Sequence, residues 1–130
     1  MRPATGVTLD ERLQTLDLFI QEGLILEAMQ RFCDPAVSMQ DTDGPATAGL
    51  PANMQRVRRF LDGVQEWIRV DITSTAIGLD TTMSETVLDF ITTEGRWRRV
   101  ERVDVAQWHN GKIVQQRCYY DSASRASHRG

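Results

Sequence analysis

The sequence predicts an α+β domain in which helices in the first half cover an antiparallel sheet formed by the second half. In the first half, Leu9, Leu13, Leu16 and Ile20 recur at the spacing of one helical face. In the second half, runs rich in β-branched residues are separated by turn signals, of which Asn110-Gly111 is the clearest. Helices followed by hairpin-linked strands favour α+β over α/β, because parallel sheets need helices between their strands. The sheet then has one face to bury, and the helices bury it.

The composition describes one ordinary globular domain. The chain has 130 residues, of which 41% are hydrophobic and 25% charged, and its net charge is -3. This charge gives no field for a nucleic acid, and no apolar run approaches the roughly 20 residues that cross a bilayer. The start of the chain is not followed by a continuous apolar stretch, so we expect no secretory signal. Cys33 and Cys118 lack metal-site spacing, and we expect reduced thiols in a cytoplasmic protein.

Three helices are expected. Thr8 and Glu11 form a capping box, in which each side chain bonds the other residue's backbone amide, and this predicts a first helix that ends near Gly23. A second, short helix is predicted over residues 24–32, because Asp34-Pro35 cannot continue it. The third starts near Pro51, a favourable first-turn residue.

The remaining elements are strands and loops. A short strand is predicted over residues 36–40, followed by a loop over residues 41–50. Four longer strands then follow, over residues 67–77, 84–92, 96–108 and 112–121. We divide the chain into an N-terminal arm (1–7), one domain (8–121) and a polar C-terminal tail (122–130).

This order of elements resembles the nuclear transport factor 2-like superfamily, and its SnoaL-like (polyketide cyclase-like) members in particular. The matching segments are residues 32–37 (Phe-Cys-Asp-Pro-Ala-Val), Gly49, residues 103–105 (Val-Asp-Val), residues 111–113 (Gly-Lys-Ile) and residues 119–121 (Tyr-Tyr-Asp). The resemblance extends over residues 8–121. It implies that the curved sheet and the three helices form a cone with an internal pocket, as in cystatin-like folds. It also implies a homodimer through the outer face of the sheet. The family includes cyclases, isomerases, an epoxide hydrolase and binding domains, so fold alone does not fix function.

Strand alternation and the resemblance together select the residues that face the pocket. Arg102, Asp104 and Trp108 share one face of their strand, and Cys118 and Tyr120 share one face of the next. Alternation does not say which face is inside. The resemblance implies that the face with Asp104, Cys118 and Tyr120 looks inward, and that Glu85 and Val87 join it.

Asp104 is the first candidate for catalysis, because it matches the acid of the oxyanion hole in ketosteroid isomerase. A carboxyl group in a half-dry pocket has a raised pKa and can donate a hydrogen bond or a proton near neutral pH. The alternative is an Asp104–Arg102 or an Arg102–Glu85 ion pair that only neutralises buried charge, since same-face neighbours on one strand lie about 7 Å apart.

Other catalytic sets of the family are incomplete in this chain. The isomerase base falls on Gln40, with Asp41 one residue away, and its helix-one tyrosine falls near Leu16. The last-strand acid of limonene epoxide hydrolase and of the cyclases falls on Cys118. Asp121 is the nearest carboxylate, but alternation points it to the other face, where we interpret it as structural.

Several candidates have an ordinary packing interpretation. Cys118 has no histidine placed to activate it, so an inert buried thiol is the alternative to a nucleophile. Tyr120 either orients a ligand or lines the wall, and Trp108 either contacts a ligand or packs in the core. The basic run at residues 96–102 divides between two faces, which favours cross-strand pairs with Asp or Glu over nucleic-acid binding.

The sequence therefore predicts a small-ligand protein without metal or cofactor. We expect it to bind a mostly apolar, carbonyl-bearing molecule. Asp104 would transfer a proton in an isomerisation or cyclisation, and Tyr120, Arg102 and Gln40 would position oxygen. Glu85, Cys118 and Trp108 are further ligand-binding candidates. The alternative is a non-catalytic ligand-binding or dimerisation domain of the same fold.

Overall fold

The computed structural model describes residues 7–120 and contains the three predicted helices. The helices are α1 (Leu9–Gln21), α2 (Ile25–Phe32) and α3 (Leu50–Asp62). The strands are β1 (Cys33–Asp41), β2 (Thr47–Ala48), β3 (Val64–Ile77), β4 (Thr81–Thr92), β5 (Trp97–His109) and β6 (Lys112–Tyr120). The predicted α+β class is therefore confirmed. The C-terminal tail and Asp121 lie outside the described residues.

Local signals in the sequence set the helix boundaries. The capping box forms as predicted: the Glu11 amide donates to Thr8 Oγ1 at 3.0 Å, and the Thr8 amide donates to Glu11 Oε1 at 2.9 Å. After α1, Gly23 adopts a φ of 80°, a conformation that costs glycine little. Pro51 lies in the first turn of α3, where its missing N–H has no cost.

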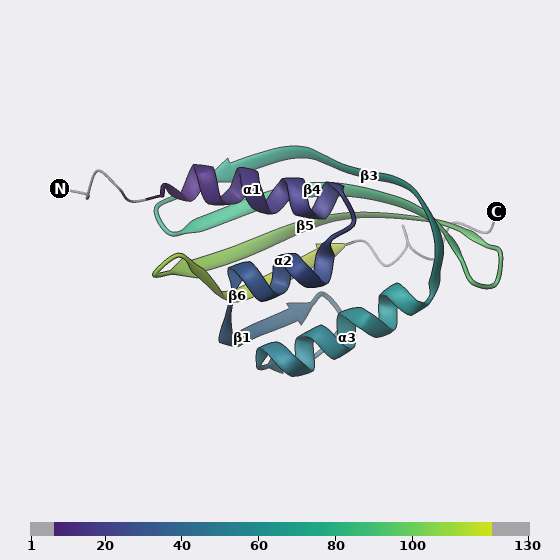
Figure 1. The fold of residues 1–130 in the computed structure, drawn as a ribbon, viewed down its shortest axis with the longest axis horizontal. Helices are drawn as coiled ribbons and strands as arrows, with labels where there is room; N and C mark the ends of the chain where they lie inside the picture. The colour runs from purple at the N-terminus through teal and green to yellow at the C-terminus, as the bar shows by residue number, and fades with distance from the viewer. Residues whose placement is uncertain (1–6, 121–130) are drawn as a thin grey trace.

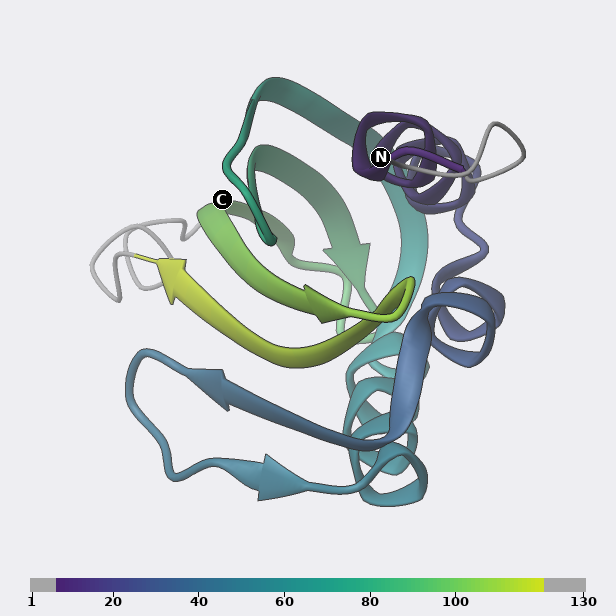
Figure 2. The same ribbon diagram turned by 90° about the vertical axis from the view of Figure 1, so that its left-hand side faces the viewer.

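The six strands form one curved, unclosed sheet in the order β2-β1-β6-β5-β4-β3 (Figure 2). Strands β3 to β6 are antiparallel neighbours, as predicted. The β1–β6 pair is parallel, so the sheet is mixed rather than wholly antiparallel. This difference arises because β1 enters the sheet directly from α2 and runs in the same direction as β6. The predicted 41–50 loop also contains the short strand β2, which pairs with β1.

The helices cover one face of this sheet, called here the inner face. Figure 1 shows α1 and α2 lying across the long strands and α3 lying beside β1. The core beneath them includes Phe32 of α2, whose ring meets the ring of Trp108 edge-on at 6.3 Å. Val37 and Ile113 are almost fully buried in the same core. The helices therefore fix which side of every strand is inside.

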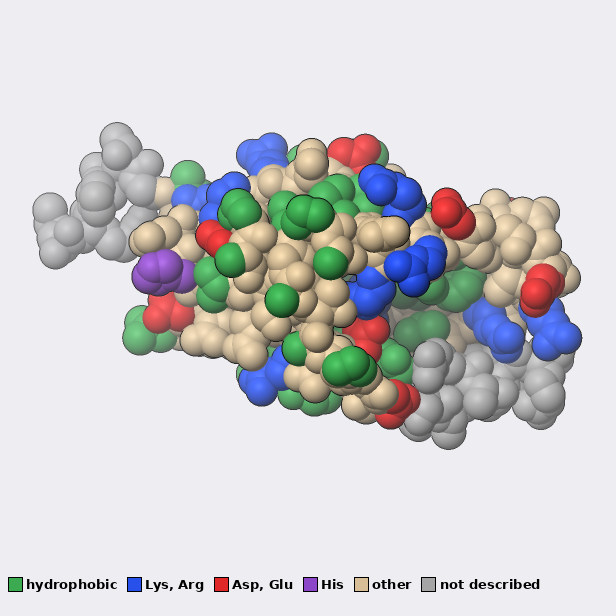
Figure 3. All heavy atoms as spheres, turned by 90° about the horizontal axis from the view of Figure 1, so that it is seen from below, with side chains coloured by type: hydrophobic (Ala, Val, Ile, Leu, Met, Phe, Trp, Pro, Cys, Tyr) green, Lys and Arg blue, Asp and Glu red, His purple; other side chains and the backbone are tan. Residues whose placement is uncertain are grey.

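The surface and the thiols agree with the composition. Cys33 and Cys118 are both buried and unpaired, as predicted. Within residues 7–120, no helix is long and apolar enough to cross a membrane. Figure 3 shows basic and acidic side chains intermingled on the face seen from below, without a broad basic patch.

Asp17 is a carboxylate on the inward stripe of α1, one turn from both Leu13 and Ile20. Burial raises its pKa from 3.8 to about 6, and it has no ion pair among the described residues. In the unfolded chain Asp17 loses its proton near pH 3.8, whereas in the native state it keeps its proton up to about pH 6. The native state therefore loses stability relative to the unfolded chain as the pH rises from 3.8 through 6.

We therefore expect Asp17→Asn to stabilise the protein above pH 6 and not at acidic pH. A shift of two pKa units corresponds to about 3 kcal/mol, which the partial exposure of Asp17 reduces to about 1 kcal/mol. Urea unfolding of both proteins at about pH 7.5 and about pH 3.5 measures the difference. An equal gain at both pH values would show that the buried charge is not its cause.

Candidate functional site

Two carboxylates and a thiol form a row across the inner face of three neighbouring strands. Asp41 of β1 lies opposite Cys118 of β6, and Cys118 lies opposite Asp104 of β5. Neighbouring strands are about 4.8 Å apart, so the two carboxylates flank the thiol at close range. The predicted inward orientation of Asp104 and Cys118 is consistent with this register. Asp41 is an additional member of the row.

Arg102 joins this row through Asp104. Its Nε lies 3.2 Å from Asp104 Oδ2, and the two side chains are 27% and 16% exposed. The ion pair considered from the sequence is therefore formed. The contact leaves Arg102 Nε and Asp104 Oδ1 buried without a hydrogen-bond partner. Both groups retain unused hydrogen-bonding capacity inside the protein.

Arg56 brings a second guanidinium from α3. Its Nη1 donates to Asp41 Oδ2 at 3.1 Å, and its Nη2 donates to Asn53 Oδ1 at 3.3 Å. Asn53 is fully buried and donates in turn to the backbone oxygens of Thr47 and Gly49. Asn53 thereby fixes the start of α3 and positions Arg56. Two ion pairs, Arg56–Asp41 and Arg102–Asp104, now define the candidate site, called here the inner cluster.

Sequence reasoning missed Asp41 and Arg56. From the sequence, Asp41 is predicted to lie in a loop rather than at the end of β1, and Arg56 is given no role in a site. One signal was available for Arg56. It lies one helical turn from Asn53, so the two polar side chains are neighbours on one side of a helix whose other inward positions are apolar. The contact with Asp41 joins residues 15 positions apart and depends on tertiary packing.

Electrostatics assigns different roles to the members of the inner cluster. The charge of Asp104, followed by weaker effects of Cys118 and Asp41, raises the pKa of Arg102 against the lowering effect of burial. Burial and then the charge of Asp104 raise the pKa of Cys118 to about 12. A thiol with this pKa is protonated at neutral pH and is not a nucleophile. The inert interpretation of Cys118 is the one that these interactions favour.

Tyr120 lies opposite Arg102 across β5 and β6 and is partly buried. Its backbone amide donates to Thr42 Oγ1 at 3.0 Å, which anchors the end of β6 to the end of β1. Its position beside Arg102 agrees with the predicted neighbourhood.

Glu85 does not share the inner face with Asp104, contrary to the predicted orientation, and its ligand-binding role stays a prediction. Glu85 lies opposite Val103, whereas Ser84 lies opposite Asp104. Since side chains alternate along a strand, a difference of one residue moves Glu85 to the outer face, and Val87 with it. Glu85 is exposed there and accepts a 2.8 Å hydrogen bond from Thr73 Oγ1.

Gln40 lies on the face of β1 opposite to Asp41, and its predicted ligand-positioning role stays a prediction. The core positions Val37 and Met39 fix the alternation of β1, so Asp41 points inward and Gln40 outward. The exposed Gln40 amide donates to the backbone oxygen of Gly44 at 3.2 Å. The polar residue that β1 contributes to the inner cluster is therefore Asp41.

Trp108 shares a face with Asp104 but is a core residue. It is 5% exposed, and its Nε1 donates to Thr82 Oγ1 at 3.0 Å. Its one polar atom is satisfied within the core, and these contacts favour the packing interpretation of Trp108.

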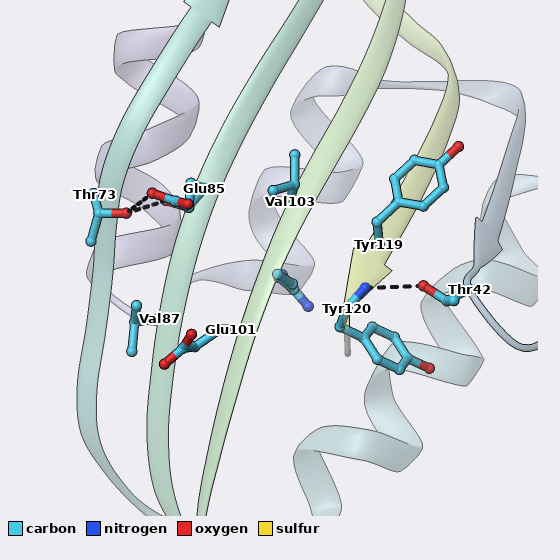
Figure 4. A pocket seen from close by; sticks show the side chains of 9 residues that line it. Thr42, Thr73, Glu85, Val87, Glu101, Val103, Tyr119 and Tyr120 are labelled. Atoms are coloured by element: carbon cyan, nitrogen blue, oxygen red, sulfur yellow. Dashed lines mark hydrogen bonds between the residues drawn. The ribbon is translucent and has the colours of Figure 1, made fainter. Parts of the chain in front are cut away.

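An open hollow of about 650 Å³ lies mostly on the outer face of the sheet. Figure 4 shows Thr73 and Glu85 pointing toward each other at one side of it, with Tyr119 at the other. Arg102 and Tyr120 also line this hollow, whereas Asp104 and Cys118 do not. Arg102 and Tyr120 therefore border both the hollow and the inner cluster.

The basic run is divided between faces, as predicted. On the outer face, Arg99 makes two 2.8 Å hydrogen bonds to the carboxylate of Asp89, the residue opposite it on β4. Asp89 is buried there, with only 6% of its side chain exposed. This pair is a cross-strand pair of the kind that the sequence predicts for the basic run. Among residues 7–120, no group of His, Cys, Asp or Glu is arranged to hold a metal ion.

The sequence matches no protein-family model and no curated protein. Solved structures are similar in fold. A candidate SnoaL-like polyketide cyclase from Mesorhizobium loti is 18% identical, with a TM-score of 0.79 over 88% of this chain and 100% of that one. A candidate isomerase from Rhodopseudomonas palustris is 19% identical, with a TM-score of 0.72 over 95% and 96%. An epoxide hydrolase from M. tuberculosis, similar to limonene epoxide hydrolases, is 13% identical, with a TM-score of 0.72 over 89% and 84%.

These likenesses show the fold: the chain has the nuclear transport factor 2-like, SnoaL-like architecture that the sequence resembles. The similar structures differ in their named activities, so function has to be argued from the inner cluster.

Proposed function

We propose that the protein binds a small, mostly apolar, carbonyl-bearing molecule at the inner cluster and transfers protons on it without a cofactor. The class of reaction is an isomerisation or cyclisation. Asp104 is the proton-transferring group, and Arg102 polarises the carbonyl oxygen, with Tyr120 beside it. The observation that carries this proposal is the buried Asp104 Oδ1, which has no hydrogen-bond partner. A carboxylate oxygen left unpaired in this way is costly for folding and useful for chemistry.

The setting of Asp104 supports this assignment. The Arg102 guanidinium lies 3.2 Å from the Asp104 carboxylate, and in this proposal Asp104 takes the role of the base. The thiol of Cys118 and the Arg56–Asp41 pair surround it with fixed dipoles and charges.

Binding of a simple aryl ketone tests the location of this site. We expect 2-acetonaphthone to shift the backbone amide signals of Asp41, Asp104 and Cys118 in an NMR titration. The outer-face residues Thr73 and Glu85 serve as the internal control. Shifts confined to Thr73 and Glu85, or no shifts at millimolar ketone, would contradict ligand binding at the inner cluster.

The second candidate function is a non-catalytic ligand-binding or dimerisation domain. The short Arg102–Asp104 contact favours it, because such a pair can be wholly structural. The outward position of Gln40 favours it too, since one predicted oxygen-positioning group is missing from the site. Binding of the ketone without any proton exchange on it would support this candidate.

In either case we propose a homodimer through the outer face of the sheet. Met83 and Tyr119 are 45% and 46% exposed on this face. Glu101 and Arg117 are also exposed there, and neither belongs to an ion pair among residues 7–120. A two-fold axis would let Arg117 of one copy meet Glu101 of the other.

Charge reversal tests this interface. We expect a dimer at micromolar concentration by light scattering, and at least a roughly tenfold weaker dimer for Arg117→Glu. The double variant Arg117→Glu/Glu101→Arg should restore much of the affinity, and Arg58→Glu on α3 should leave it unchanged. A stable monomer of the unmodified protein would rule the interface out.

A further inference from the structure

Three buried side-chain atoms among the described residues have no hydrogen-bond partner: Arg56 Nε, Arg102 Nε and Asp104 Oδ1. All three belong to the inner cluster. Folded proteins satisfy nearly all their buried polar atoms, so three unsatisfied atoms in one place require a common explanation. A bound polar group supplies it, because it would pair with atoms that the chain itself leaves unpaired.

The Arg102–Asp104 pair specifies the chemistry of that group. Arg102 Nε lies 3.2 Å from Asp104 Oδ2, but its N–H makes no hydrogen bond, and the second carboxylate oxygen accepts none. The pair thus offers one spare donor next to one spare acceptor. A hydroxyl oxygen can accept the first bond and donate the second at the same time. A carbonyl or ether oxygen can only accept, and an ammonium group can only donate.

The net charge of the inner cluster limits which ligands it can bind. The positive charges of Arg56 and Arg102 are balanced by the negative charges of Asp41 and Asp104. The N–O distance is 3.1 Å in the Arg56–Asp41 pair and 3.2 Å in the Arg102–Asp104 pair. A ligand with its own buried charge would lack a counter-charge and would pay for desolvation. The cluster therefore favours a neutral ligand.

We propose that the ligand of the inner cluster is a neutral hydroxyl or enol compound whose O–H donates to Asp104 Oδ1 and accepts from Arg102 Nε. This inference rests on the proposed function, because it places the ligand at the same cluster. It adds the identity of the polar group. The two atoms are buried, but both side chains retain some exposure, at 27% and 16%.

A hydroxyl compound and its methyl ether, which lacks the donor hydrogen, together test the proposal. Binding of 2-naphthol and of 2-methoxynaphthalene is measured by calorimetry at pH 7, where the naphthol is neutral. The ether keeps the ring and the acceptor oxygen but cannot donate. We expect the naphthol to bind at least about tenfold more tightly, since a hydrogen bond to a charged acceptor is lost in the ether. Equal affinity overturns the proposal, and so does a failure of the naphthol to bind at millimolar concentration.

The chain contains a matched control for the variant. Arg69 and Asp71 form a second Arg-x-Asp pair on one strand, with Nε 2.6 Å from Oδ2, but both are exposed. In Arg102→Gln/Asp104→Asn, we expect the preference for the naphthol to fall to about threefold or less, because charge assistance is lost. In Arg69→Gln/Asp71→Asn, it should persist. Loss of the preference in the control alone would overturn the proposal. The comparison of the two probes on the unmodified protein needs no variant to fold.

The outcomes separate this inference from the proposed function. Preference for the naphthol without any proton exchange on a ketone would sustain the inference and remove the acid–base function. Proton exchange that depends on Asp104, together with equal affinity for naphthol and ether, would sustain the function and remove the inference.

Discussion

Replacing Asp104 by Asn should slow proton exchange on a bound ketone by about 100-fold or more. In the proposed reaction, a C–H bond beside the carbonyl breaks, its proton moves to the Asp104 carboxylate, and the electron pair moves to the oxygen beside Arg102. Return of a proton from exchanged solvent completes the cycle. Asn keeps the shape of Asp but cannot accept this proton, and general-base catalysis typically contributes 10²–10⁴-fold.

The measurement uses the α-protons of 2-acetonaphthone in D₂O, followed by NMR. Binding of the ketone should change far less than the exchange rate, because Asn retains an oxygen for contacts. Cys118→Ser provides the control, and we expect its rate to stay within about threefold, since a thiol with a pKa of about 12 takes no direct part. An unchanged rate in Asp104→Asn would remove Asp104 from the mechanism.

Replacing Asp89 by Ala should destabilise the fold by about 3 kcal/mol, the largest effect we expect on stability. The Asp89 side chain is 6% exposed and receives both hydrogen bonds of the Arg99 guanidinium at 2.8 Å. Breaking such a pair leaves a charge without its partner in a partly buried place, and this typically costs 3–5 kcal/mol. Because Arg99 is 34% exposed, water compensates part of the loss, and we expect the lower end of that range.

Urea unfolding measures this effect, with Asp71→Ala as the matched control. Asp71 also pairs with an arginine, but it is 53% exposed, and exposed pairs contribute less than about 1 kcal/mol. The Asp89→Ala protein should also melt roughly 10 °C lower. If the two variants lost similar, small amounts of stability, the Asp89–Arg99 pair would not be the structural element described above.

Much of the fold could be predicted because its signals are local. The capping box of Thr8 and Glu11 and the hairpin at Asn110-Gly111 involve residues at most three positions apart. Alternation along β5 correctly placed Arg102 and Asp104 on one face. These signals work because helix and strand periodicities are fixed by backbone geometry.

The candidate site was predictable only in part, since its members come from different elements. Asp104, Arg102 and Cys118 were identified from alternation together with the family resemblance. Glu85 and Gln40 were both placed by the family resemblance, which does not fix the register of a strand to a single residue. In the structure Ser84 lies opposite Asp104, and Asp41 rather than Gln40 points inward. A single-residue difference in register reverses such an assignment.

The sequence by itself determined the helices, the strands and the set of side chains that share each face of a strand. The tertiary structure decided which faces the helices cover, that β1 pairs with β6 in parallel, and that Asp41 and Arg56 meet across α3 and β1. The physical reason is the separation along the sequence of the residues that interact. Hydrogen bonding within a helix or hairpin depends on residues a few positions apart, whereas the inner cluster depends on how whole elements pack. The two ion pairs around Asp104 and Asp41, with three polar atoms still unpaired, exist only once that packing is complete.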